Sequence, residues 1–338
     1  MSLRLYDPYF WHNKIDPLTD IRNMGIITAG DVYWVSKVTD SDHTARIDAL
    51  GRKIVKVDVQ SAVDATVNDQ NDYILTVPGD GGTAISVGTA IDLNKDRVHL
   101  LGLGYTKAIR GYTSTIQDSM GTVPDTEVLA VTGDGVEVGG LRFVGTLGTN
   151  DGGTMSNGVL FLGTSAHGFW AHDSVFESSM NVWGTPPVVR GQGTAANDVR
   201  FDNCAFAQTG TGNVEAAANS GLVLSGAGNK RWTFNDCEFS MSAGSTTETL
   251  FTPGINSETT RLIRCFFRNV NGTAFAITSA IRGSVTANHP VILKDCWGIG
   301  FTQMGTDPNV FKTPTASGTR ALVYDSGLAI GSAMLVAA

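Results

Sequence analysis

A histidine followed directly by an aspartate is the residue pair in this chain best suited to acid–base chemistry. His172 precedes Asp173, and His167 lies five residues before His172. An imidazole next to a carboxylate can accept and release a proton near neutral pH. Adjacent His and Asp residues are also frequent by chance, so a purely structural contact is the alternative interpretation. The repeat that surrounds this pair predicts that His172 points outward.

The four cysteines are the second group that could do chemistry, as metal ligands or as disulfides. They are Cys204, Cys237, Cys265 and Cys296, separated by 33, 28 and 31 residues. Zinc requires ligands that converge tetrahedrally, and a disulfide requires a particular torsion. Thiols at one position of successive repeats form a row instead of converging. We therefore predict a column of buried thiols that pack as small apolar groups.

These cysteines belong to a repeated apolar pattern. With Cys237 as position 0, apolar residues stand at −5, −3, 0 and +2, namely Trp232, Phe234, Cys237 and Phe239. Apolar or small residues recur at these positions in eight copies. The residues at position 0 are Leu103, Leu141, Ser174, Cys204, Cys237, Cys265, Cys296 and Ser326. A period near 30 residues is typical of stacked units that cannot bury an apolar face alone.

The spacing inside each copy predicts a sharp corner. Positions −5 and −3 share one face of a strand, and so do positions 0 and +2, but the odd step between the two pairs would reverse the face of a continuous strand. The chain must therefore turn at −2 and −1. A left-handed residue suits such a corner, and seven of the eight residues at −1 are Gly, Asp or Asn. They are Gly102, Gly140, Asp173, Asn203, Asp236, Arg264, Asp295 and Asp325. The corner explains the recurring aspartates, and metal binding by them is the alternative.

Two strands that meet at a corner in every repeat predict a right-handed parallel β-helix of about eight or more coils. Third strands are expected at 128–131, 159–162, 188–190, 222–224, 250–252 and 275–277. Position +2 is aromatic in six of eight copies and should form an inward stack, because it has the same parity as position 0. Here the chain resembles the pectin-lyase-like superfamily of β-helix proteins over about two-thirds of its length. The resemblance concerns architecture and includes no catalytic motif.

The chain is expected to divide into four parts. Residues 1–58 form an N-terminal arm and linker, 59–79 a capping helix and first strand, 80–330 the parallel β-helix, and 331–338 an apolar tail. A helix at 60–67 followed by a strand at 72–77 resembles the capped entry of many pectin-lyase-like domains. The arm contains the aromatic residues Tyr6, Tyr9, Phe10 and Trp11, which make it a candidate docking arm. Folding of the arm over the first coil is the alternative.

Bulk properties exclude several classes of function. The net charge of −8 argues against nucleic-acid binding, which needs a basic surface. The chain lacks an apolar run of 18 residues and an N-terminal apolar signal segment, so we expect neither a membrane span nor secretion through a signal peptide. Nucleotide-binding loops and nucleophile elbows are also absent. We expect no metal and no cofactor. The sequence favours a role without catalysis but leaves open whether the chain is an enzyme.

An outward aromatic pair is the candidate binding surface. Phe266 and Trp297 stand at +1 of successive copies, with Arg264 and Arg268 nearby. Exposed rings beside guanidinium groups suit a carbohydrate or a partner chain. A loop that covers the pair is the alternative.

A rigid rod with few charges and with apolar or aromatic ends resembles β-helix virion proteins of tailed bacteriophages. This analogy predicts a non-enzymatic structural protein of a phage particle, a decoration or stabilising protein on the capsid surface. It would be located in the virion after assembly in the host cytoplasm. Its partners would be the major capsid protein or a tail protein and further copies of itself, a trimer being one arrangement. The alternative is a tailspike or fibre with polysaccharide-binding or depolymerase activity, which needs an outward cluster of acids or an Asp/Arg pair on one sheet.

Overall fold

The fold was determined from a computed structural model of the whole chain. It describes residues 30–35, 55–56, 58–76, 84–102, 114–118, 127–145, 158–178, 187–192, 196–209, 222–225, 228–243, 248–253, 259–270, 277–281 and 291–305. The docking arm with Tyr6, Tyr9, Phe10 and Trp11, the eighth copy at 321–328 and the tail at 331–338 lie outside these residues.

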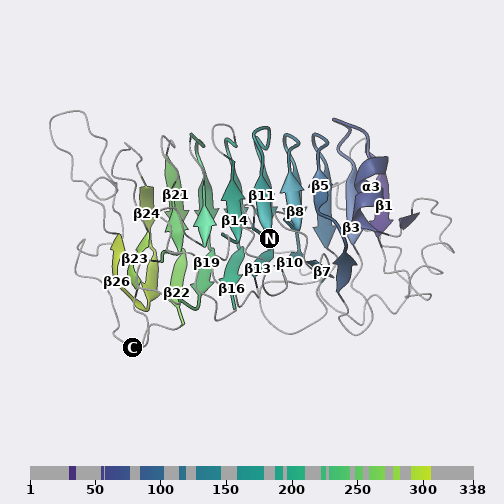
Figure 1. Cartoon of the computed structure of the whole chain (residues 1–338). Coiled ribbons are helices and arrows are strands. Elements are labelled where there is room, and N and C mark those ends of the chain that lie inside the picture. The colour runs from purple at the N-terminus through teal and green to yellow at the C-terminus, as the bar shows by residue number, and fades with distance from the viewer. Residues whose placement is uncertain are drawn as a thin grey trace, which may run out of the picture.

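The described residues form a rod of three sheets in which neighbouring strands run parallel (Figure 1). Sheet A runs in the order β2 (Val55–Lys56), β1 (Val32–Val35), β3 (Tyr73–Thr76), β6 (His99–Gly102), β9 (Glu137–Gly139), β12 (Trp170–His172), β15 (Arg200–Asp202), β18 (Thr233–Asn235), β21 (Thr260–Ile263) and β24 (Val291–Lys294). Sheet B consists of β4 (Ile85–Val87), β7 (Ser114–Asp118), β10 (Leu141–Gly145), β13 (Val175–Ser178), β16 (Ala205–Gln208), β19 (Glu238–Met241), β22 (Phe266–Asn269) and β25 (Trp297–Ile299). Sheet C consists of β5 (Ile91–Leu93), β8 (Leu129–Val131), β11 (Leu160–Leu162), β14 (Val189–Gly191), β17 (Val223–Leu224), β20 (Phe251–Thr252), β23 (Ile277–Ile281) and β26 (Phe301–Gly305).

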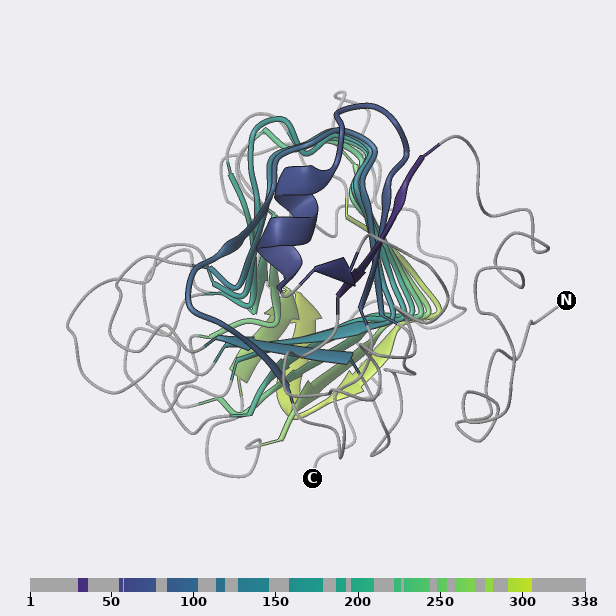
Figure 2. The same cartoon turned by 90° about the vertical axis from the view of Figure 1, so that its right-hand side faces the viewer.

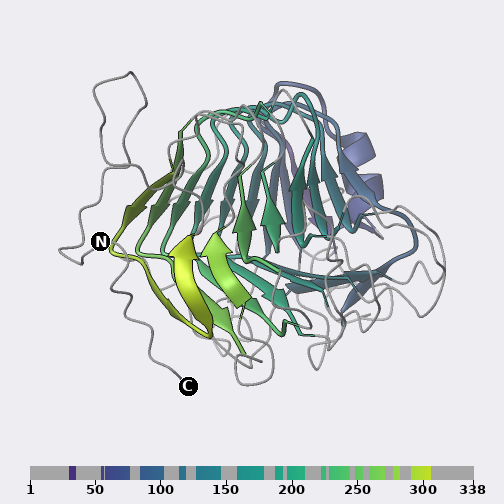
Figure 3. The ribbon, with the colours of Figure 1, turned by 60° about the vertical axis from the view of Figure 1, so that its left-hand side comes forward.

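The parallel β-helix predicted from the repeat is confirmed. Each coil contributes one strand to each sheet, and the coils stack along the rod (Figures 1 and 3). Inward positions are buried as expected, since Phe201, Cys204 and Phe206 have no exposed surface. The rings at position +2 stack from coil to coil, with 5.8 Å between the centroids of Phe176 and Phe206 and 5.1 Å between those of Phe206 and Phe239. Five of the predicted third strands are found within one residue of their expected bounds, as β8, β11, β14, β17 and β20, whereas β23 begins at Ile277, the last residue of the sixth predicted strand.

The predicted corner between sheets A and B is left-handed at position −1 in six coils. The φ angles there lie between 49° and 65°, at Gly140, Asp173, Asn203, Asp236, Arg264 and Asp295. A second left-handed column, which the sequence analysis missed, lies before sheet A at position −6. Its members have φ between 56° and 64° and are Asn71, Arg97, Gly135, Gly168, Asp198 and Arg231. Among the described residues, four coils have a left-handed residue at both corners, in the pairs Gly135 and Gly140, Gly168 and Asp173, Asp198 and Asn203, and Arg231 and Asp236.

The register predicted for the first copy of the repeat is wrong beyond its strand in sheet A. Gly102 ends β6, and its φ is not positive. The strand that pairs with β10 is β7, which places Ser114 opposite Leu141 and Ile116 opposite Phe143. Ser114 and Ile116 therefore hold positions 0 and +2, which the sequence assigned to Leu103 and Tyr105. The chain carries an insertion at this corner, and an insertion breaks a register that is inferred from spacing alone.

A short helix covers the N-terminal end of the rod, as predicted. Helix α3 (Val59–Ala65) lies across the opening enclosed by the three sheets (Figure 2). The Asp58 side chain caps it by accepting a hydrogen bond from the backbone N–H of Ser61 at 2.7 Å. Val59, Ala62 and Val63 are fully buried and join the core. Among the described residues, no helix is long and apolar enough to cross a membrane.

Sheet A begins before residue 80, at which the β-helix was predicted to start. Strands β1, β2 and β3 pair within sheet A although they precede residue 80. Tyr33, Trp34 and Val35, which were assigned to the arm, are buried. The domain boundaries at residues 58, 79 and 330 stay predictions, but the hydrogen-bonded sheet extends across the first two.

Candidate functional site

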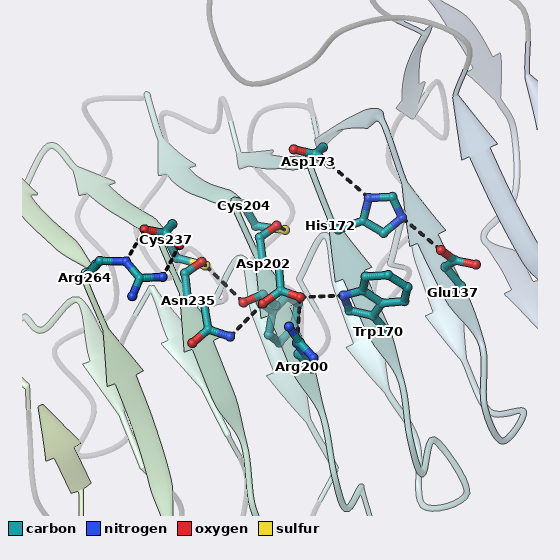
Figure 4. Close-up of polar contacts among 12 residues, drawn as sticks. Glu137, Trp170, His172, Asp173, Arg200, Asp202, Cys204, Asn235, Cys237 and Arg264 are labelled. Atoms are coloured by element: carbon teal, nitrogen blue, oxygen red, sulfur yellow. Dashed lines mark hydrogen bonds and ion pairs between the residues drawn. The ribbon is translucent and has the colours of Figure 1, made fainter. Parts of the chain in front are cut away.

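The outward side of sheet A carries a row of polar and aromatic side chains that could do chemistry, among them Glu137, Trp170, His172, Arg200 and Asp202 (Figure 4). Because the strands pair in parallel without a shift in register, outward residues at positions −4 and −2 form two columns along the rod. The −4 column contains Tyr73, His99, Glu137, Trp170, Arg200 and Thr233. The −2 column contains Gly139, His172, Asp202 and Asn235.

Glu137 lies between two histidines of neighbouring coils. Its carboxylate contacts His99 Nδ1 at 2.5 Å through Oε2 and His172 Nε2 at 3.0 Å through Oε1. The other nitrogen of His172, Nδ1, lies 3.1 Å from Oδ2 of Asp173. The three side chains of His99, Glu137 and His172 are 16%, 18% and 24% exposed. The predicted His172–Asp173 pair therefore exists, but as one end of a larger cluster.

Glycine makes room for this cluster. Gly139 of the preceding coil faces His172 in the −2 column, and a Cβ atom built on it would come within 2.4 Å of two atoms of the imidazole. No such overlap is tolerated, so any larger residue would push the ring of His172 away. Aromatic neighbours hold both imidazoles. Tyr73 stacks on His99 with 4.4 Å between ring centroids, and Trp170 lies 4.6 Å from His172.

The electrostatics of the cluster favour its charged forms. Burial alone would raise the pKa of Glu137, but hydrogen bonds from His172 and His99 outweigh burial and lower it to about 2. Burial would lower the pKa of His172, whereas hydrogen bonds to Asp173 and Glu137 raise it to about 9. At neutral pH the carboxylate is therefore ionised and His172 is protonated.

A second network continues the −4 and −2 columns. Asp202 accepts a hydrogen bond from Trp170 Nε1 at 2.8 Å and one from Asn235 Nδ2 at 2.7 Å, and it pairs with Arg200 Nε at 2.6 Å. The guanidinium carbon of Arg200 lies 5.9 Å from the centroid of Trp170, within range of a cation–π contact. Trp170 is nevertheless 38% exposed. Rings and charges of this face thus contact one another across coil boundaries.

The corners carry side-chain ladders of their own. Arg264 binds Asp236 through two hydrogen bonds of 2.7 and 2.6 Å, and Arg231 binds Asp198 in the same bidentate way at 2.6 and 2.7 Å. Asn203 donates a short hydrogen bond to Asp173. In each case a residue of one coil binds a residue of the next. The predicted patch member Arg264 is therefore a corner residue whose guanidinium is engaged with Asp236.

The aromatic pair predicted as a binding surface lies as expected on sheet B. Phe266 and Trp297 are register partners in β22 and β25, with their ring centroids 4.1 Å apart and planes tilted by 31°. Trp297 is 51% exposed and Phe266 is half-buried. Arg268 is exposed on the same face of β22. Binding of a ligand or partner to this pair stays a prediction.

The cysteines form an inward column of free thiols. Each thiol donates a weak hydrogen bond to a corner carbonyl of its own coil, and three also reach the preceding coil. Cys237 Sγ lies 3.3 Å from the carbonyl oxygen of Asn235 and 3.5 Å from that of Phe201. Burial raises the pKa of Cys204 to about 12. These thiols therefore satisfy backbone acceptors and are poor nucleophiles.

Across the described part of the chain, no group of three or more His, Cys, Asp or Glu side chains is arranged to hold a metal ion. The sequence analysis identified His172 and Asp173 but missed Glu137, His99, Trp170 and Asp202. The signal was present in the repeat, because these residues occupy the outward positions −4 and −2 that flank the inward −3.

Comparisons with known proteins agree on the fold. No family model matches this chain, and no curated protein does. Among solved structures, a pectin methylesterase from Aspergillus niger has a TM-score of 0.51 at 13% identity and covers 90% of this chain and 87% of that chain. A pectin methylesterase variant in complex with a hexasaccharide has a TM-score of 0.50 at 10% identity, over 86% of this chain and 92% of that chain. The protein ORF18 of Geobacillus virus E2 has a TM-score of 0.38 at 15% identity, over 86% of this chain and 57% of that chain.

The two pectin methylesterases establish that the chain has the pectin-lyase-like parallel β-helix fold, and at these identities they establish the fold alone. The viral protein is too distant in structure to carry an argument.

Proposed function

We propose that this chain is a non-enzymatic structural protein of a bacteriophage particle, a rigid rod that decorates or stabilises the capsid surface. The observation that carries the non-enzymatic part is that outward charged groups bind each other between successive coils. Asp198 with Arg231, Asp236 with Arg264, and Glu177 with Arg142 join one coil to the next. Isolated surface pairs contribute little, but networks of them with bidentate geometry stiffen a repeated structure.

The protonation states of the sheet A cluster also favour a structural role. A general acid or base works best when its pKa lies near the working pH. The contacts of Glu137 and His172 move their pKa values to about 2 and about 9, in opposite directions away from neutrality. Each group is held in its charged form by the other, which is suited to holding coils together and poorly suited to proton transfer.

The phage assignment rests on analogy with β-helix virion proteins, and the same analogy gives the proposed partners of this chain. The major capsid protein or a tail protein would bind the rod, and copies of this chain would assemble with one another, in a trimer as one arrangement. The exposed Trp297 beside Phe266 is the described surface best suited to such a contact, because large exposed rings mark interaction sites.

Gold-labelled antibodies against this chain, imaged on purified phage particles, test the proposal. Label spread over the capsid surface is the expected result. Label confined to the tail would replace the decoration role by a spike or fibre, and unlabelled particles would contradict a virion role altogether. Particles from a host infected with an unrelated phage serve as the control for antibody specificity.

A polysaccharide-binding spike is the second candidate, and the exposed Trp170 favours it. The indole contacts Asp202 and Arg200, which offer hydrogen-bonding groups next to an aromatic ring, and Asn235 binds Asp202 from the following coil. The same face also carries the Asp202–Arg200 pair on sheet A, one of the two arrangements that a depolymerase would need.

Calorimetric titration with surface polysaccharide of the host separates the two candidates. Binding that is lost in Trp170→Ala but retained in a Phe266→Ala/Trp297→Ala double variant would favour the spike and place the site on sheet A. Loss in the double variant, with unchanged melting temperature, would place it on the aromatic pair instead. Absence of binding and of sugar release leaves the structural proposal standing.

A further inference from the structure

The cluster around Glu137 joins three consecutive coils through a single carboxylate. His99 comes from β6, Glu137 from β9 and His172 from β12, which are successive strands of sheet A. The other outward ion pairs described above involve a guanidinium: Asp198 with Arg231, Asp236 with Arg264 and Glu177 with Arg142 join two coils, and Arg200 with Asp202 lies within β15. The Glu137 cluster differs from them because its basic partners are imidazoles, which lose their charge at a much lower pH than guanidinium groups do.

We propose that Glu137, clasped between His99 and His172, is a protonation-dependent lock that fastens these three coils of the rod. While the carboxylate is ionised and His172 is protonated, both carboxylate oxygens are bridged to neighbouring coils. Loss of the proton from His172 leaves a single N–H to serve two carboxylates, Glu137 and Asp173, and removes the positive charge that attracts both of them in a partly buried position. The lock then opens on the β12 side first.

The groups that face the lock can be named strand by strand. Tyr73 of β3 stacks on His99, and His99 is the β6 member of the lock itself. From β12, the neutral ring of Trp170 covers His172, and Asp173 at the following corner holds His172 Nδ1. Asp202 of β15 is turned toward Trp170, Arg200 and Asn235. Two carboxylates, Glu137 and Asp173, thus contact His172 and both favour its protonated form.

The sign of the pH effect follows from the two shifted groups. The pKa of Glu137 is lowered from 4.5 to about 2, so its contribution to stability is present above pH 4.5 and is lost as the pH falls toward 2. The pKa of His172 is raised from 6.5 to about 9, so its contribution is complete below pH 6.5 and is lost as the pH rises through 9. The lock is therefore fully closed between about pH 4.5 and 6.5 and opens on the alkaline side.

Hydrogen exchange of the full-length protein, measured by pulse labelling and mass spectrometry, tests this lock. Rates are divided by the intrinsic exchange rate at each pH. In the wild type, peptides that contain β9 and β12 should lose about tenfold of their protection between pH 6.5 and 10. Peptides that contain β18 and β21, whose strands carry no histidine, should change much less and provide a control within the same molecule.

Three variants separate the lock from a general alkaline effect. His172→Gln should remove the loss of protection near pH 9 in β9 and β12, because the side chain no longer titrates. Gly139→Ala should do the same while keeping every titrating group, since its Cβ displaces the ring of His172. Asp198→Asn, which breaks the bidentate pair with Arg231, should leave the pH profile of β9 and β12 unchanged.

A profile that stays flat in the wild type would overturn the lock, and so would an alkaline loss of protection that persists unchanged in His172→Gln. If a variant fails to fold, the comparison between β9/β12 and β18/β21 in the wild type still decides the question. Equal pH dependence in the two regions would contradict the proposal.

Discussion

Phe239 and Phe267 hold the same position in two successive coils and stack with their ring centroids 4.8 Å apart and their planes 13° apart. Both side chains are fully buried, and each also extends the column of rings that begins at Phe143. This relationship gives the rod much of its core, because each coil buries its aromatic face against the same face of the next coil. Most of the expected behaviour of the chain follows from such contacts between coils.

Phe239→Ala should destabilise the rod by about 3–5 kcal/mol, the usual cost of a large cavity in a packed core. The cost should be near the top of this range because Phe239 contacts rings in both neighbouring coils, Phe206 and Phe267. Equilibrium unfolding in guanidinium measures it. Trp297→Ala is the matched control, since that ring is half exposed and should cost far less. A free energy of unfolding unchanged in Phe239→Ala would contradict the register.

Gly102→Ala should destabilise the first coils by about 3 kcal/mol. A Cβ atom at Gly102 would come within 2.1 Å of the carbonyl oxygen of Gly140 in the next coil, so two backbones would have to separate. Gly88→Ala is the control, because a Cβ atom there meets nothing within 4 Å and should change stability by less than about 0.5 kcal/mol. Thermal unfolding of both variants provides the comparison, and equal melting temperatures would refute the close approach.

Substitutions at Arg231 test whether backbone conformation or ion pairing contributes more to stability at the corner before sheet A. Its φ is 56°, and its guanidinium binds Asp198 in an exposed pair. Arg231→Gly loses a pair that is worth at most about 1 kcal/mol and gains a similar amount from relief of the left-handed backbone, so its stability should stay near the wild-type value. Arg231→Val loses the pair and adds a β-branched residue to that backbone, for a total cost of about 2 kcal/mol. Equal stabilities of the two variants would show that the corner is not restrictive.

The thiols of the inward column should be unreactive in the folded protein. Burial raises the pKa of Cys204 to about 12, and burial also raises the pKa of Cys265, while a contact with Cys265 raises that of Cys296. Titration with a chromogenic disulfide at pH 8 should therefore show no rapid phase before unfolding and four equivalents after unfolding in guanidinium. A rapid equivalent in the native protein would place a thiol outside the column and would point to Cys296, the most exposed of the four.

The sequence was sufficient to predict the parts of the fold that repeat. The residues Phe201, Cys204 and Phe206 were identified as inward because parity and spacing are preserved from coil to coil, and the left-handed residue at Asp236 followed from the odd step between the pairs. Prediction failed at Leu103 and Tyr105, where an insertion moves the sheet B strand to Ser114, because spacing alone cannot locate an insertion within a coil.

The candidate site was predicted in part. His172 and Asp173 were identified because they are adjacent in sequence, and Phe266 with Trp297 because they share a repeat position. The contact between Glu137 and His99 was not predicted, because the two residues lie in different copies of the repeat and the contact depends on the direction in which their side chains point. Gly139, which makes room for the ring of His172, carries no functional chemistry of its own. The repeat gives the register of these three coils in sheet A correctly, but spacing alone does not show which outward side chains contact one another.

The number of copies of this chain in purified particles tests the central claim most directly. Quantitative mass spectrometry, calibrated with labelled peptides of this chain and of the major capsid protein, gives the ratio of the two. A capsid-surface decoration predicts hundreds of copies per particle, in a fixed proportion to the shell protein. A handful of copies would point to a tail spike and make polysaccharide cleavage the next assay, and complete absence from the particles would contradict the proposed function.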